Sequence, residues 1–114
     1  MANYVNDYEF RNEIRDYYKT PKGTPVPECI GRKLVLISYN FAKRPRYTKS
    51  PILDIMISQG IEQMHWCLYE RRYKINGEMS PFAFFTKQCH YGFLEAIRNE
   101  KKHQNKRVYL DEEL

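Results

Sequence analysis

SPFAFFTKQCHYGFLEAIRNEKK, residues 80–102, is the stretch that decides the fold, because it reads as one long helix. Ser80 and Pro81 mark its start: a serine oxygen caps free backbone N–H groups, and proline at the first helical position has no N–H to satisfy. The first half is aromatic and the second half is basic. The pattern predicts a helix of about 25 residues that ends near Asn105.

Three further helices are predicted upstream of this stretch from the spacing of apolar residues. Prolines and glycines separate them, most densely in TPKGTPVP, residues 20–27, which cannot continue a helix. The predicted helices cover residues 7–18, 28–42 and 51–69. Pro45 lies in a basic link after the second of them, whose cations are Lys43, Arg44, Arg46 and Lys49.

These elements predict an all-α fold, a small bundle of about four helices with a long C-terminal helix, since no alternating strand pattern is present. The chain has 114 residues, which suits one domain with one modest core. The predicted domain covers residues 1–107, and VYLDEEL, residues 108–114, is an apolar-acidic tail.

The composition points to a polyanionic partner. The formal net charge is +5, and aromatic residues make up 15% of the chain, more than a small core needs. A basic balance favours nucleic acid or a membrane face, although a merely soluble basic protein has the same charge. No apolar run approaches the ~20 residues that span a bilayer, and the first residues contain no apolar signal core. We therefore expect a soluble protein of the cell interior.

No motif of an enzyme or a metal site stands out. The chain contains no Gly-rich phosphate loop, no HExxH and no CxxC. His65 and Cys67 are two apart and Cys89 and His90 are adjacent, and neither spacing places both side chains on one helix face. Buried thiols are the simpler interpretation, and we expect no catalysis, metal or cofactor.

The joint between the third and fourth predicted helices concentrates the chemistry. ERRYKIN, residues 70–76, places three cations and one ring in a short segment, and FAFF, residues 82–85, follows closely. Cations neutralise phosphates, and flat rings offer stacking partners to unpaired bases. This combination is what a protein needs to hold a melted strand. The alternative is that rings such as Phe82 and Phe85 belong to the core, because they fit a helical stripe.

The pattern resembles region 2 of bacterial sigma factors, and most of all the late-transcription sigma factors of T-even-type bacteriophages. The likeness covers roughly residues 4–102. MISQGIE, residues 56–62, is similar to a polar-Gly-Ile motif on the helix that docks on RNA polymerase, and residues 80–102 are similar to the promoter-reading helix. Each match alone is weak, and their shared order and spacing carry the resemblance.

The resemblance implies a sigma-region-2-like phage protein in the cytoplasm of an infected bacterial host. Such a protein is monomeric outside the transcription complex and has two partners, core RNA polymerase and promoter DNA. Its third helix would pack on a coiled coil of the largest polymerase subunit. The polymerase-binding candidates on this helix are Asp54, Ser58, Gln59, Glu62 and Gln63.

The fourth helix and the turn before it would recognise and melt an A/T-rich, minus-ten-like promoter element. Cations would hold phosphates, rings would stack on or wedge beside an extruded base, and polar side chains would read a base edge. The DNA-binding candidates are Arg71, Arg72, Lys74, Phe82, Phe84, Phe85, Lys87, Gln88, His90, Arg98, Lys101 and Lys102.

The chain also departs from the family. Housekeeping sigma factors carry a tryptophan pair where Phe85 and Thr86 stand here, so their base preference does not carry over. The tail resembles a flap-binding segment in composition only, so polymerase-flap contacts by Tyr109, Leu110 and Leu114 and a frayed tail remain alternatives.

Two other functions remain open from the sequence. The first alternative is a stand-alone helical DNA-binding regulator. The second is a phage protein that inhibits host RNA polymerase through the same docking face. Tight duplex binding without polymerase would favour the first alternative. Silencing of host transcription without any start from a phage promoter would favour the second.

Overall fold

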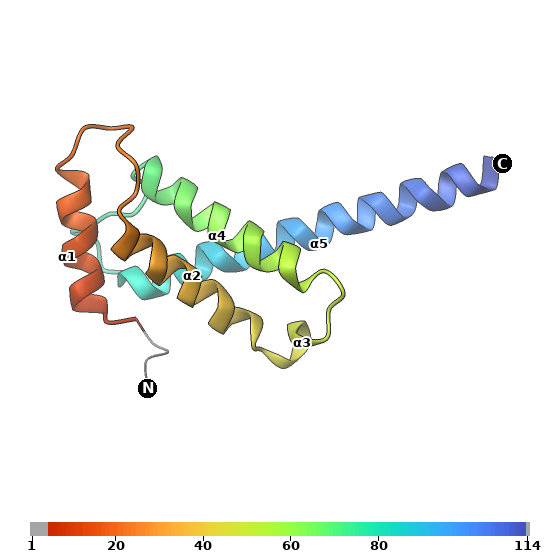
Figure 1. Ribbon diagram of the computed structural model, residues 1–114, viewed down its shortest axis with the longest axis horizontal. Helices are drawn as coiled ribbons and strands as arrows, with labels where there is room; N and C mark the ends of the chain where they lie inside the picture. Colours follow the sequence, from red (N-terminus) through yellow and green to blue (C-terminus); the bar gives the residue numbers. More distant parts are fainter. Residues whose placement is uncertain (1–4, 114) are drawn as a thin grey trace.

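Packed helices form a bundle from which the end of the last helix projects (Figure 1). The computed structural model describes the backbone of residues 5–113 and the side chains of residues 5–104. This part of the chain contains no strand, which confirms the all-α prediction and the long C-terminal helix. None of its helices has the length and apolar character needed to cross a membrane. The described helices are α1 (Asp7–Tyr18), α2 (Glu28–Ala42), α3 (Pro45–Thr48), α4 (Leu53–Tyr69) and α5 (Pro81–Glu113).

The link between α2 and α4 differs from the prediction. Pro45 begins the short helix α3, because proline suits the first position of a helix. The next helix begins later than residue 51. Ser50 does act as a local cap, since its Oγ accepts a hydrogen bond from the backbone N–H of Ile52 at 3.3 Å, but the regular helix α4 starts only at Leu53.

α5 is longer than predicted. It has 33 residues and continues past Asn105 to Glu113, because no proline or glycine follows Gly92 to stop it. The tail predicted at residues 108–114 is therefore helical in its backbone up to residue 113. The side chains of Tyr109 and Leu110, and all of Leu114, lie outside the described residues.

α4 and α5 cross at two glycines. A Cβ atom added to Gly92 would lie 2.5 Å from the carbonyl oxygen of Gln59 and 2.7 Å from the Cα atom of Gly60. A Cβ atom added to Gly60 would lie 2.9 Å from atoms of three neighbouring side chains. These distances are too short for any real Cβ contact, so the two helices pack backbone against backbone.

α2 joins this crossing through a buried polar contact. Ser38 is fully buried, and its hydroxyl donates to the carbonyl oxygen of Ile57 in α4 at 2.8 Å. The thiol of Cys89 in α5 lies 3.7 Å from the same hydroxyl oxygen. Burial raises the pKa of the Cys89 thiol to about 11, so the group stays protonated and can donate. One hydroxyl thus connects three helices.

α1 covers the beginning of α5. The Phe10 ring packs on the Phe85 ring with their centroids 5.4 Å apart. A carboxylate oxygen of Asp7 accepts a hydrogen bond from the backbone N–H of Phe82 at 2.9 Å, and Ser80 Oγ accepts one from Ala83 at 3.1 Å. Two of the free N–H groups at the start of α5 are therefore satisfied from within the protein.

Replacing Gly92 with alanine is expected to lower the free energy of unfolding by about 1–3 kcal/mol, because the new methyl group must push α4 and α5 apart. Gly31 in α2 is the control, since a Cβ atom there meets nothing within 4 Å. Gly31→Ala should stabilise the protein by up to about 1 kcal/mol through helix propensity. Urea unfolding of both variants measures the difference. Equal effects would contradict a backbone-to-backbone crossing.

Candidate nucleic-acid interface

A cavity of about 280 Å³ lies at the joint between α4 and α5. It brings together Arg72, Lys74 and Phe84, three of the predicted DNA-binding residues. Apolar surface from Met79 and aromatic surface from Tyr73 complete its walls. The cavity therefore combines rings with cations, as the sequence of this segment predicts. Its lining residues are Arg72, Tyr73, Lys74, Gly77, Glu78, Met79 and Phe84.

Tyr73 fixes the joint to the core. Its side chain is 2% exposed, and its ring packs on the Phe84 ring with the centroids 5.2 Å apart. Its hydroxyl donates to the carbonyl oxygen of Met79 at 2.8 Å. Its own carbonyl accepts from the hydroxyl of Tyr18 in α1 at 3.0 Å. Because Tyr73 is held inward, its neighbours Arg72 and Lys74 lie on the outside, where both are exposed.

Trp66 belongs to this surface and was not among the predicted site residues. The guanidinium carbon of Arg72 lies 4.9 Å from the centre of its ring, and the indole is 47% exposed. The π electrons of an exposed ring attract a guanidinium group, and the N–H groups of the guanidinium stay free to donate hydrogen bonds. The available signal was that Trp66 is the only tryptophan of the chain and stands on the polar side of the third predicted helix.

The phenylalanines of α5 divide between surface and core. Phe85 is 0% exposed and packs among Phe10, Tyr73 and Phe84, so its predicted contact with DNA is wrong. The physical reason is helical spacing, since Phe85 shares one buried stripe with Cys89 and Phe93. Phe82 is 41% exposed, and Phe84 is half-buried at the cavity. These two rings remain candidates.

Arg71 is a structural residue, which corrects its assignment to phosphate binding. Its guanidinium donates to the carbonyl oxygen of Tyr18 at 2.7 Å and to that of Thr20. It also lies over the Tyr18 ring, 5.5 Å from the centroid. The backbone of Arg71 is left-handed, with a φ of 57°, which turns the chain out of α4. Arg71 therefore ties the joint to the end of α1.

Two predicted residues with different roles contact each other. The Nε2 atom of Gln63, a polymerase candidate, donates to the Oε1 atom of Gln88, a DNA candidate, at 3.0 Å. The thiol of Cys67 donates to the same oxygen at 3.3 Å. Burial raises the pKa of that thiol, which keeps it a donor. Gln63 and Gln88 thus lie half-buried in the seam between α4 and α5.

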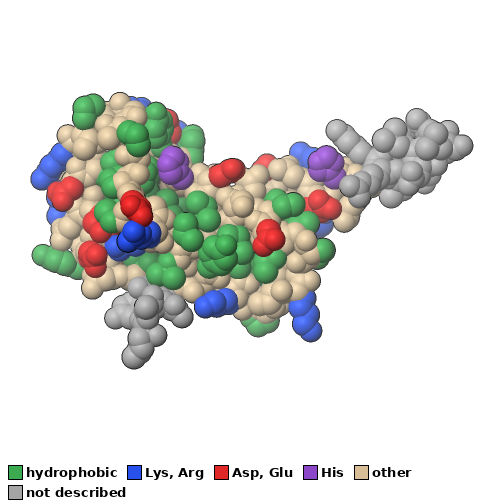
Figure 2. All heavy atoms as spheres, in the orientation of Figure 1, with side chains coloured by type: hydrophobic (Ala, Val, Ile, Leu, Met, Phe, Trp, Pro, Cys, Tyr) green, Lys and Arg blue, Asp and Glu red, His purple; other side chains and the backbone are tan. Residues whose placement is uncertain are grey.

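The other polymerase candidates lie on the outer side of α4. Asp54, Ser58 and Glu62 are exposed, and their spacing of four residues places them along one line of the helix. Ile55 beside this line is 52% exposed. Gln59 is half-buried near the crossing with α5. The exposed stripe is available to a partner. Figure 2 shows apolar side chains gathered on the face where α2 and α4 lie.

The remaining DNA candidates follow α5. Lys87, Arg98, Lys101 and Lys102 are all exposed. Arg98 lies 3.8 Å from a carboxylate oxygen of Glu95, an exposed pair that neutralises little in water. His90 is half-buried, with its ring edge-on to Phe41 of α2 at a centroid distance of 5.6 Å. The structure therefore places His90 on the side of α5 that faces α2.

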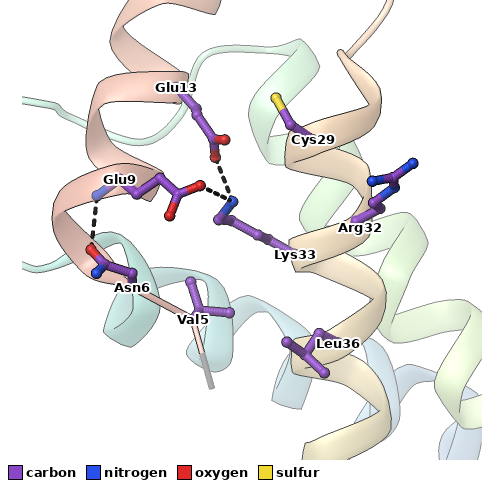
Figure 3. A pocket seen from close by; sticks show the side chains of 8 residues that line it. All are labelled: Val5, Asn6, Glu9, Glu13, Cys29, Arg32, Lys33 and Leu36. Carbon is purple, nitrogen blue, oxygen red and sulfur yellow. Dashed lines mark hydrogen bonds and ion pairs between the residues drawn. The ribbon is translucent and has the colours of Figure 1, made fainter. Parts of the chain in front are cut away.

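A second cavity, of about 340 Å³, lies between α1 and α2 (Figure 3). Lys33 occupies its centre, 2.9 Å from a carboxylate oxygen of Glu13 and 3.3 Å from one of Glu9. Burial alone lowers the pKa of Lys33, but the two carboxylates outweigh this effect and raise it. The charges here satisfy one another. The described residues contain no group of three or more potential metal ligands.

Arg71 and Arg72 are adjacent in sequence and should respond differently to substitution. Arg71→Ala is expected to lower the free energy of unfolding by about 1.5–3 kcal/mol, because it removes charged hydrogen bonds to two carbonyl groups. Arg72→Ala should cost no more than about 1 kcal/mol, since it removes only a contact with an exposed ring. Thermal and urea unfolding measure both values. A larger loss for Arg72→Ala would overturn the assignment of the two roles.

Comparison of the sequence with known proteins does not identify a family for this chain. No protein-family model matches the chain, and no curated protein matches it.

Proposed function

We propose that this protein is a phage-type sigma factor, which binds a bacterial-type core RNA polymerase and helps it open an A/T-rich, minus-ten-like promoter element. The observation that carries the proposal is the joint cavity, where Arg72, Lys74 and Phe84 share one space. The resemblance of residues 4–102 to sigma-factor region 2 supplies the partner. The protein performs no chemistry in this proposal and acts by binding alone.

The size of the joint cavity suits one flat ring. Pockets for drug-sized ligands span about 300–1,000 Å³. The joint cavity, with about 280 Å³, is slightly smaller and therefore suits a ligand of the size of a single base. Phe84 and Tyr73 supply aromatic walls, while Arg72 and Lys74 stand exposed at its edge. A single extruded base would fit against the rings, with its phosphate towards the cations. A duplex would be too wide to enter.

The energies balance for such a role. Extruding a base from a duplex costs a few kcal/mol, and each contact between a base and an aromatic ring returns about 1–3 kcal/mol. The cavity ring Phe84 offers one such contact, whereas the exposed ring of Trp66 lies outside the cavity lining and has Arg72 over it. The protein alone would therefore only offset the cost of opening. A small promoter-reading protein of this kind needs the polymerase to complete melting.

The outer face of α5 provides a path for the duplex beside the opened segment. Exposed cations lie along this face at Lys87, Arg98 and Lys101. The first and the last are 14 positions apart, about 21 Å of helix at about 1.5 Å per residue. Phosphates follow one another along duplex DNA at about 3.4 Å per strand. These phosphates would be bound by side chains, because Asp7 and Ser80 already cap the start of α5.

The exposed stripe of α4 is the proposed polymerase contact. Asp54, Ser58 and Glu62 offer polar groups on a rigid helix, and Ile55 adds apolar area beside them. This face lies on α4, whereas the joint cavity opens where α4 ends. Polymerase binding and DNA binding therefore use different surfaces and can be separated by substitution.

The polymerase contact is tested with Ser58→Arg/Glu62→Lys, which changes the charge of the α4 stripe. Binding to core polymerase should weaken at least about tenfold, since wrong charges in an interface cost on the order of 1.4 kcal/mol or more. Tyr8→Arg/Asp16→Lys makes the same charge change on exposed positions of α1 and should bind normally. Co-purification and titration with core polymerase provide the measurement. Failure of the wild-type chain to bind would end the sigma-factor proposal.

The DNA contact is tested with Arg72→Gln/Phe84→Leu, which removes a cation and a flat ring but keeps apolar volume. Promoter opening should fall about 5- to 150-fold, the equivalent of one lost base–ring contact of about 1–3 kcal/mol. Arg32→Gln/Tyr39→Leu is the matched control in α2. A fluorescent base analogue in the promoter strand reports opening. Normal opening by the cavity variant, with polymerase binding intact, would remove the cavity from the mechanism.

A stand-alone DNA-binding regulator is the second candidate. The exposed cations along α5 favour it, because they are accessible without any polymerase. The two functions differ in affinity for duplex DNA at physiological salt. The sigma-factor proposal expects weak binding by the chain alone, since one small basic face makes few phosphate contacts. Specific and tight duplex binding by the free chain would favour the regulator.

A further inference from the structure

We infer that KRPRYTK, residues 43–49, forms a second phosphate-binding surface on the flank of α5 opposite the joint cavity. We call these residues the basic link, as they join α2 to α4 and contain α3. The ligand is the sugar-phosphate backbone of the nucleic-acid strand that does not enter the cavity. This inference rests on the proposed function only for the class of ligand, a nucleic acid.

The charge of the basic link is not neutralised by the protein. Its four cations, Lys43, Arg44, Arg46 and Lys49, are exposed, and the segment contains no carboxylate. None of the four lies within 4.0 Å of a carboxylate in the part of the chain with described side chains. Some cations elsewhere do pair with carboxylates, namely Lys19, Lys22, Arg32, Lys33 and Arg98. The basic link shares its lack of ion pairs with the exposed lysines of α5 in the described part of the chain. Figure 2 shows basic side chains along the edge of the molecule around α3.

Both arginines of the basic link are held on aromatic rings. The guanidinium carbon of Arg44 lies 4.2 Å from the centre of the Phe41 ring, and that of Arg46 lies 5.5 Å from the centre of the Tyr47 ring. Stacking on a ring fixes a guanidinium plane while its N–H donors stay free at the edge. Such arginines are ordered in advance for the two-pronged contact that phosphate oxygens accept.

The same rings place the basic link beside α5. Phe41 packs edge-on against Phe93 with the centroids 5.0 Å apart, and Tyr47 packs against Phe93 at 5.2 Å. A small cavity of about 110 Å³ connects Arg44 to Phe82 and Thr86. The hydroxyl oxygen of Thr86 is buried there without a hydrogen-bond partner among the described residues.

α5 therefore has a cation on a ring at each flank. Arg72 over Trp66 lies towards α4, and Arg44 over Phe41 lies towards α2. Because Arg44 and Arg72 lie on different neighbours of α5, they can contact two separate backbones. One strand would follow the joint cavity while the other follows the basic link.

Helix ends explain only part of the charge. Lys43 and Arg44 follow directly after α2, where cations favour the negative end of the helix. Arg46 lies in the last turn of α3 and Lys49 caps that helix, but α3 has only four residues, so its dipole favours these cations little. Stability alone would also not require both guanidinium groups to be exposed. Phosphate binding explains all four positions.

The test is the salt dependence of DNA binding by the chain, measured on a short duplex with one unpaired end. Arg44→Gln/Arg46→Gln removes two proposed phosphate contacts, so the slope of log K against log salt should become shallower by about 1.8. Lowering the salt tenfold should then strengthen wild-type binding about 60-fold more than binding of the variant. Arg15→Gln/Arg32→Gln, with the same loss of charge on exposed positions of α1 and α2, should keep the wild-type slope.

A second variant distinguishes the loss of phosphate contacts from a loss of folding. Arg44→Lys/Arg46→Lys keeps the charge, so it should keep the wild-type slope and lose only part of the affinity. An unchanged slope for the glutamine variant, or an equal change in the control, would overturn the inference, as would absence of DNA binding at low salt. Polymerase binding and promoter opening by the joint-cavity variants are measured separately. Failure here therefore leaves the proposed function standing or falling on its own tests.

Discussion

The structure depends on the contact of two helix backbones at Gly60 and Gly92. Because no side chain separates α4 from α5 there, the helices cannot slide along each other without a collision. The register that follows brings Gln88 to Gln63. One turn earlier on α5, the same register brings Phe84 to the end of α4, where the joint cavity forms. The geometry of the candidate site is thus set by a steric constraint some distance away from it.

The joint also illustrates how adjacent cations take different roles. Arg71 has a left-handed backbone, and its guanidinium donates to the carbonyl oxygens of Tyr18 and Thr20. Arg72 turns outward and keeps its donors free above an exposed ring. Tyr73 decides between them, because its burial fixes which neighbour faces the solvent. Charge in a short segment therefore says little about function until the anchoring residue is known.

The sequence was sufficient for the fold class, for the bounds of α1 and α2, and for the combination of Arg72, Lys74 and Phe84 at one place. These features could be predicted because they depend on apolar periodicity and on helix starts, which are signals between residues close in sequence. Phe85 belongs to the buried stripe that the sequence offered as the alternative, and Phe10 of α1 covers it. Arg71 was assigned wrongly because its carbonyl partners lie at the end of α1, far away in sequence. Trp66 was missed for a related reason, since its partner Arg72 reaches it only after the chain has turned.

Two of the three cysteines, Cys29 and Cys89, differ in how far they are open to solvent. Cys29 is exposed on α2, whereas Cys89 is enclosed where α2, α4 and α5 meet, beside Ser38. A thiol-modifying reagent can attack Cys29 in the folded protein, but it reaches Cys89 only when those three helices separate. The labelling rate of Cys89 relative to that of Cys29 therefore reports how often the centre of the bundle opens, and no cysteine has to be introduced for the measurement.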